Sequence, residues 1–158
     1  MLFWKKNIVG LDIGSSYLKL VQLDSSRSGY ELILFEMLPI QSDIITEGVV
    51  TDKDKLTAAI QELLKKTGLK KGDAVLGISG HASVIIKRIT VPHMNEDELS
   101  LGIKYEAEQY IPFDINEVNI GFQMLGPKPQ EAGQMEIVLV AVKKNVINDY
   151  AEVVANSG

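Results

Sequence analysis

Two apolar segments separated by only three small residues constrain the fold more than any other feature of this sequence. Residues 7–13 are rich in branched apolar side chains, as buried strands are, and residues 17–24 form a second such segment. Parallel strands need a long crossover, so this short connection predicts an antiparallel hairpin. After a turn at residues 25–29, a third strand covers residues 30–38 and ends at Pro39. The chain therefore opens with a three-stranded meander.

A helix and a returning strand follow the meander. Thr51 or Asp52 is suited to cap a helix at its start, and Gly68 to end it. Between them, apolar side chains recur at helical spacing, at Leu56, Ile60, Leu63 and Leu64. Residues 73–79 then form another apolar strand. A strand, a helix and a second strand predict a crossover unit, with residues 73–79 parallel to an earlier strand.

The second half of the chain has a different order of elements, beginning with a predicted strand at residues 83–91. Asn95 and Glu98 have the spacing of a capping box and open a helix that runs to Tyr110. Gly102 lies inside this helix at a cost of about 1 kcal/mol relative to Ala. We therefore expect another backbone to pass close to Gly102.

Two strands at residues 117–125 and 134–142, and an amphipathic helix at residues 145–156, complete the chain. The residues expected to point inward from this last helix are Val146, Tyr150, Val153 and Val154. The order strand, helix, strand, strand, helix indicates a small α+β module. The sequence thus predicts two domains, residues 1–80 and residues 81–158.

Composition excludes several classes of function. The 158 residues carry a net charge of −5, which argues against a nucleic-acid partner because no basic surplus faces the phosphates. The chain contains no cysteine, so disulfides and thiolate metal sites are excluded. No apolar run approaches the ~20 residues that a membrane span needs.

The first hairpin has the residues of a phosphate site. Gly14, Ser15 and Ser16 are small enough for a ligand to approach the backbone amides, which carry partial positive charge. Asp12 can hold the water shell of Mg²⁺, and Lys19 can reach back toward a phosphate. An ordinary tight turn would use the same residue types, so the pattern alone leaves both interpretations open. No Gly-Lys-Ser/Thr follows, and no helix follows the turn, which excludes a P-loop and a dinucleotide fingerprint.

The same segment, GLDIGSS at residues 10–16, resembles the first phosphate motif of the superfamily of actin, Hsp70 and sugar kinases. Within it, the chain is similar to the PilM family of type IV pilus assembly proteins, which are related to the division protein FtsA. LGISG at residues 76–80, ITVP at 89–92 and EDEL at 96–99 support the resemblance. YEAEQYIPF at residues 105–113 is its most specific part.

The resemblance implies a fold and a ligand. The fold class is mixed α/β, the N-terminal part of an actin-like, ribonuclease H-like fold. Residues 1–80 would belong to subdomain 1A, and residues 81–158 would be the inserted strand-helix-strand-strand (SHS2) subdomain 1C. The cofactors are ATP and Mg²⁺, with no catalytic residue assigned. Asp12 would hold Mg²⁺ through bound water, and Lys19 would face the β- or γ-phosphate. Backbone amides that donate hydrogen bonds to the phosphate would come from Gly14, Ser15 and Ser16.

The resemblance also implies partners. Members of the family are cytoplasmic and lie at the inner membrane through a partner, PilN, whose short cytoplasmic tail they bind near the junction of 1A and 1C. They link the pilus motor and assembly proteins to the membrane, and self-association is a further expectation. For the peptide groove, the candidates are Tyr105, Tyr110, Ile111 and Phe113. Packing in the core is the alternative interpretation of this apolar cluster.

One departure from the family pattern affects the cofactor. An actin-like site is closed by a second phosphate loop and an adenosine pocket, and nothing after Gly80 resembles either. We therefore expect a truncated or degenerate relative that, as these 158 residues alone, does not bind ATP tightly and is at most part of a weak ATPase. An FtsA-like filament protein and a fragment of a sugar or acetate kinase are the alternative functions.

Overall fold

The computed structural model describes residues 8–26, 29–69, 72–80 and 83–158. The chain forms two compact units, each treated separately below. The first unit comprises Met1–Ala82 together with Asn148–Gly158, and the second comprises Ser83–Ile147.

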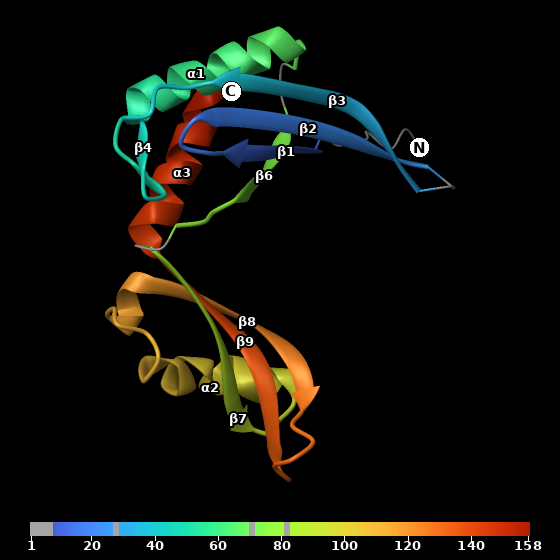
Figure 1. The fold of residues 1–158 in the computed structure, drawn as a ribbon, viewed down its shortest axis with the longest axis vertical. Helices are drawn as coiled ribbons and strands as arrows, with labels where there is room; N and C mark the ends of the chain where they lie inside the picture. Colours follow the sequence, from blue (N-terminus) through green and yellow to red (C-terminus); the bar gives the residue numbers. More distant parts are fainter. Residues whose placement is uncertain (1–7, 27–28, 70–71, 81–82) are drawn as a thin grey trace. The chain divides into compact units, whose positions relative to one another are not determined.

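A four-stranded sheet in the order β3-β2-β1-β6 is the centre of the first unit (Figure 1). Its strands are β1 (Ile8–Ile13), β2 (Tyr17–Ser26), β3 (Gly29–Pro39) and β6 (Asp73–Gly77). β2 pairs antiparallel with both β1 and β3, and β6 pairs parallel with β1. The predicted meander and crossover are therefore confirmed.

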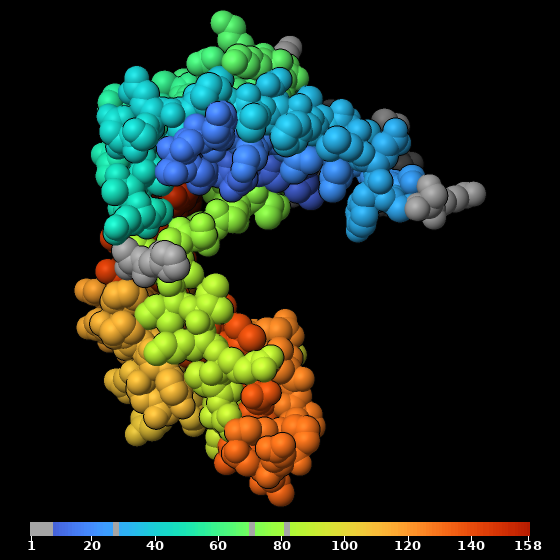
Figure 2. Space-filling model, viewed as in Figure 1, coloured from blue at the N-terminus to red at the C-terminus, as the bar shows by residue number. Residues whose placement is uncertain are grey.

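The β2–β3 hairpin is longer than the sequence predicted. β2 continues to Ser26 and β3 begins at Gly29, so both strands occupy positions expected in the turn. The ladder stays paired to its end, where Ser26 lies opposite Gly29. In the space-filling view, this end of the hairpin extends beyond the rest of the first unit (Figure 2).

Helix α1 (Lys53–Thr67) is capped by Asp52, one of the two candidates that the sequence offered with Thr51, and ends at the predicted Gly68. The Asp52 carboxylate accepts a hydrogen bond from the Lys55 amide at 3.0 Å, which satisfies one of the free donors of the first turn. Gly68 ends the helix in the left-handed conformation, with φ 72°. Leu56, Ile60 and Leu63 form its buried face.

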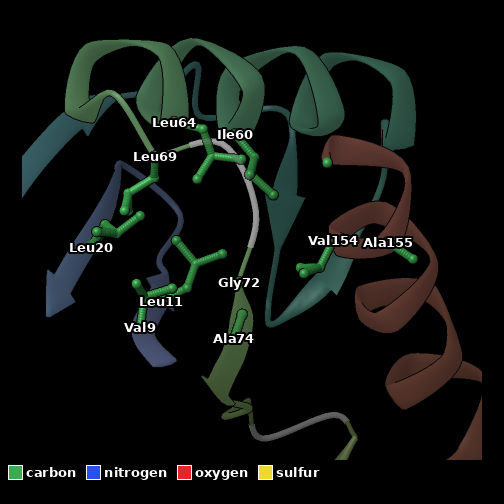
Figure 3. Close-up of a pocket in the computed structure, with 11 residues that line it drawn as sticks. Val9, Leu11, Leu20, Ile60, Leu64, Leu69, Gly72, Ala74, Val154 and Ala155 are labelled. Atoms are coloured by element: carbon green, nitrogen blue, oxygen red, sulfur yellow. The ribbon is translucent and has the colours of Figure 1, made fainter. Parts of the chain in front are cut away.

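Helix α1 and the last helix, α3 (Lys144–Ser157), lie over the same side of the sheet (Figure 3). They enclose a cavity of about 150 Å³. The side chains that line it are all apolar: Val9, Leu11, Leu20, Ile60, Leu64, Leu69, Ala74, Val154 and Ala155. A lining of this kind belongs to a packed core and offers nothing to a charged ligand.

The end of α3 belongs to the first unit, although the sequence analysis assigned this whole helix to the second domain. Tyr150 and Val153 are buried as expected, with 3 % and 1 % of their surface exposed, and Val154 is half-buried. Lys53 Nζ lies 2.6 Å from both an Asp149 and a Glu152 carboxylate oxygen, which ties α1 to α3. A boundary drawn only at residues 80/81 misses this return of the chain, because apolar spacing shows which face a helix buries but not against which partner.

A small hairpin of β4 (Ile45–Thr46) and β5 (Val49–Val50) was not predicted. Its turn residues Glu47 and Gly48 both have positive φ, 51° and 80°. A Cβ atom on Gly48 would overlap the Ser79 carbonyl oxygen, so only glycine fits there. Strands of two residues are too short to produce a periodic signal in the sequence.

The second unit is a three-stranded antiparallel sheet with one helix on it (Figure 1). Its elements are β7 (Val84–Pro92), α2 (Glu96–Glu108), the 3-10 turn η1 (Ile115–Glu117), β8 (Val118–Pro127) and β9 (Gln134–Lys143). The sheet order is β7-β9-β8. One core joins α2 to the sheet through Ile89, Val91, Leu99, Ile103, Ala107, Ile111, Val118, Met135, Ile137, Leu139 and Ala141.

Helix α2 confirms its predicted start but not the expected environment of Gly102. The Asn95 side chain accepts from the Glu98 amide at 2.9 Å, and the Glu98 carboxylate accepts from the Asn95 amide at 3.0 Å, a complete capping box. Apart from the backbone of α2 itself and the adjacent residues, no atom of the described part of the chain lies within 4 Å of a Cβ built on Gly102, so the expected close backbone is wrong. Gly102 is on the flank of the helix, ~100° from the buried Ile103, and faces open space.

Candidate functional site

The turn between β1 and β2 is closed by a hydrogen bond from the Gly14 amide to the Tyr17 carbonyl at 3.0 Å. A Cβ atom at Gly14 would lie 3.2 Å from the same oxygen, so the tight turn favours glycine there. The Gly14 amide is thus used within the turn and is not available to a ligand. Among the described residues, no backbone hydrogen bond occupies the amides of Ser15 or Ser16. These two serines are the remaining donors of the predicted set.

Asp12 and Lys19 lie directly opposite each other in the β1–β2 ladder. Lys19 Nζ is 2.9 Å from Asp12 Oδ2, and the two side chains are 47 % and 60 % exposed. Both point to the open side of the sheet, because their neighbours Leu11, Leu18 and Leu20 are buried on the other side. The two charged residues that the sequence singled out are therefore brought together at the strand ends next to the turn.

Two glycines lie beside this ion pair, and they differ in their surroundings. A Cβ atom on Gly10 would lie 2.9 Å from Val21 Cγ1, so packing favours glycine there, whereas the position of Gly77 is open. Gly77 of β6 is the residue opposite Asp12, and Gly10 precedes Asp12 on the same side of β1. Asp12, Lys19 and both glycines line a hollow on the open side of the sheet, whose remaining walls include Val21, Phe35 and Val75. The hollow is open to solvent and apolar except for the ion pair, so water screens the two charges.

A second hollow lies at the tip of the same turn, entirely within the first unit. It is lined by Gly14 and Ser15, by Glu47 and Gly48 of the β4–β5 hairpin, by Ser79 and Gly80 after β6, and by Tyr150 of α3. The Tyr150 hydroxyl donates to the Gly48 carbonyl at 3.3 Å, and burial raises the pKa of Tyr150, which keeps the hydroxyl a donor. The β1–β2 turn thus lies against closely packed backbone of the β4–β5 hairpin and of residues 79–80.

The chemistry of the site fits a hydrated magnesium ion and does not fit zinc. No group of three or more His, Cys, Asp and Glu side chains in the described ranges could hold a metal ion by itself. Asp12 is a single carboxylate beside free amides. It fits Mg²⁺, which keeps several waters and takes its other ligands from a phosphate. It does not fit a zinc site, which needs at least three protein ligands.

The four aromatic and apolar groove candidates do not form one cluster. Ile111 is 6 % exposed and part of the core of the second unit, and Tyr110 and Phe113 pack against that core. Lys143 Nζ lies 4.3 Å from the centre of the Phe113 ring, a cation–π contact. Tyr105 is 84 % exposed.

Tyr105 has a different neighbour, which the sequence analysis missed. Leu101 is 89 % exposed and lies one helical turn before Tyr105 on α2. Both residues are on the side of the helix opposite the buried Leu99 and Ile103. The sequence contains this signal, because a four-residue spacing places Leu101 and Tyr105 on one face of the helix.

In the described ranges, no helix is both long enough and apolar enough to cross a membrane.

The fold places the chain among proteins of the actin-like fold. The chain belongs to the family of the type IV pilus assembly protein PilM, whose family model matches residues 10–158. The predicted fold class and resemblance are both confirmed.

Two solved structures are similar to this chain. One is a PilM–PilN type IV pilus biogenesis complex, with 30 % sequence identity and a TM-score of 0.83 over 96 % of this chain and 45 % of that one. The other is the cytoplasmic domain of EpsL, an inner-membrane component of the type II secretion system of Vibrio cholerae. It has 12 % identity and a TM-score of 0.55, and the match covers 96 % of this chain and 53 % of EpsL, so it shows the fold alone. The chain spans about half the length of each of these proteins.

Proposed function

We propose that this chain is part of a nucleotide-binding scaffold of type IV pilus assembly that docks the cytoplasmic tail of a PilN-like inner-membrane protein. The observation that carries the proposal is the similarity to a PilM solved with PilN, at a TM-score of 0.83 over 96 % of this chain. Membership of the PilM family supports it. The scaffold would be cytoplasmic and held at the inner membrane by its partner, close to the pilus motor.

The nucleotide half of the proposal rests on the first hairpin. The amides of Ser15 and Ser16 would bind phosphate oxygens, and Lys19 would contribute a positive charge from β2. Asp12 would hold Mg²⁺ through water, and the metal would screen the charge of the triphosphate. Gly14 would shape the turn, since its own amide bonds to Tyr17. Lys19 would exchange its contact with Asp12 for one with phosphate.

The second part of the proposal concerns the partner, and it assigns each of the two units to a subdomain. We assign the sheet of residues 1–80, with the end of α3, to subdomain 1A, and the β7–α2–β8–β9 module to subdomain 1C. Tyr105 is the most accessible of the groove candidates, whereas Ile111 is buried. The tail would contact Tyr105 on the outer face of α2, and Tyr110 and Phe113, which pack against the core beyond the end of α2, would form a separate, half-buried part of the contact. The buried Ile111 would support these residues from the core.

A binding experiment tests both halves. Fluorescence anisotropy would measure the affinity of a labelled PilN-like tail peptide for the complete natural protein that contains this chain, with and without MgATP. We expect binding in both conditions, with an affinity that nucleotide changes at least 5-fold, the lower end of typical coupling. Absence of peptide binding in either condition would contradict the scaffold, and equal affinities would contradict the coupling.

A further inference from the structure

One edge strand of the second unit carries no charged residue. β7 and β8 are the edges of the sheet, and β9 lies between them. β8 has the sequence VNIGFQMLGP, without a charge, whereas β7 carries Lys87 and Arg88 at its middle. Exposed edges are usually protected by charged side chains, because their free amides and carbonyls otherwise pair with another strand. β8 lacks this protection.

The side chains of β8 that face α2 are also incompletely covered. Ile120, Phe122 and Met124 pack against the core but are only partly buried. On the central strand β9, Ile137 and Leu139 point the same way and are fully buried, at 0 % exposure. The difference arises because β9 has a strand on each side and β8, in the part of the chain described, pairs with β9 only. Another strand beside β8 would remove this apolar surface from water.

We propose that β8 pairs with β8 of a second copy of this chain, antiparallel about a two-fold axis. The two three-stranded sheets would become one continuous sheet. A register centred on Phe122 places this ring opposite its own copy and Ile120 opposite Met124, all on the side of α2. On the other side, Gly121 lies opposite Gln123. Aromatic and apolar cross-strand pairs of this kind stabilise a sheet, and no like charges meet.

The other long edges do not suit the same pairing. In β7, a register centred on the strand brings Lys87 or Arg88 against a like charge of the copy, which opposes pairing. β3 carries Glu31 and Glu36. β8 meets no like charge when it pairs with its own copy, and a two-fold axis supplies that partner through the same surface patch on both subunits.

Sedimentation velocity over a range of protein concentrations tests the proposal. The unaltered chain is expected to form a dimer as concentration rises. Gln123→Lys, which adds a charge to the exposed side of β8, is expected to weaken the dimer at least 10-fold. The matched control is Gln130→Lys, in the exposed loop between β8 and β9, which should dimerise like the unaltered chain. A chain that stays monomeric at its solubility limit, or two variants that dimerise alike, would overturn the proposal.

Cross-linking tests the register, because the chain has no cysteine of its own. In the proposed pairing, residue 121 of one copy faces residue 123 of the other, within the distance that a disulfide spans. A mixture of Gly121→Cys and Gln123→Cys chains should therefore cross-link under mild oxidation at least 5-fold faster than either variant alone. Gly121 has open space around it, so the new side chain fits. Equal rates in all three samples would exclude this pairing.

Discussion

The two units both cover one side of a sheet with helix, but they differ in what remains on the open side. In the second unit, the open side of β9 carries Val138 and Val140, residues that a sheet needs for its own packing. The second unit also carries an ion pair on its open side, Arg88–Glu136, at 4.0 Å between β7 and β9. In the first unit, the Asp12–Lys19 pair is closer, at 2.9 Å, and lies at the strand ends beside the β1–β2 turn. Among the described residues, no backbone hydrogen bond occupies the amides of Ser15 and Ser16 in that turn. The position of the pair beside these amides, and not the presence of charge, distinguishes the first unit. Substitutions in the core should therefore change stability, and substitutions of the ion pair should change ligand binding.

The largest expected effect belongs to the core of the second unit. Leu139 is fully buried at the centre of β9, and Leu139→Ala leaves a cavity that the surrounding side chains cannot fill. We expect a loss of about 3 kcal/mol in the free energy of unfolding, within the range for buried Leu→Ala changes. Urea unfolding followed by circular dichroism measures it. A loss below ~1 kcal/mol would mean that this core is not closely packed.

A substitution in the β4–β5 hairpin of the first unit should cause a comparable loss of stability by straining the backbone. Gly48→Ala puts a Cβ atom on top of the Ser79 carbonyl at a residue with φ 80°. We expect a loss of about 2 kcal/mol or more, because both strain and displacement of Ser79 contribute. Gly121→Ala is the matched control, since that position is open. If the two variants melted at the same temperature, the contact between Gly48 and Ser79 would not be rigid.

The capping box of α2 contributes less. Asn95→Ala removes the acceptor of the Glu98 amide and leaves the first turn of the helix with a free donor. The expected loss is about 1 kcal/mol. Asn95→Asp keeps the acceptor and serves as the control in the same urea titration. Should alanine and aspartate behave alike, the box would not stabilise this helix.

The smallest effect has the opposite sign. Gly102→Ala adds a methyl group in open space within α2 and lowers the conformational freedom of the unfolded chain. We expect a gain of about 0.5–1 kcal/mol, seen as a higher melting temperature. A loss of stability would restore the original expectation that another backbone approaches Gly102.

The sequence was sufficient to predict helices and strands where apolar spacing and capping residues indicate the same element. The meander, the crossover to β6, the Asp52 and Gly68 caps and the capping box at Asn95 were all predictable, because each depends on residues near in sequence. It was insufficient where distant segments meet. The contact of Gly48 with Ser79 and the return of α3 to the first unit depend on the tertiary fold, and no local pattern encodes them.

The same division holds for the candidate site. Asp12 and Lys19 were predicted and lie together, since strand alternation and a short turn fix their positions. The engagement of the Gly14 amide in the turn was not predictable, because it depends on the exact turn geometry. Tyr105 was expected beside Tyr110 and Phe113, but it lies with Leu101 on the exposed face of α2. Closeness in sequence at the end of a helix does not place residues on the same face.

Calorimetric titration of MgATP into the complete natural protein that contains this chain tests the central claim most directly. The account predicts that Asp12→Asn and Lys19→Ala each weaken MgATP binding at least 10-fold, about 1.4 kcal/mol. Each should change the free energy of unfolding by less than ~1 kcal/mol, as expected for an exposed ion pair. Unchanged MgATP affinity in both variants, with folding intact, would contradict a phosphate site at the first hairpin.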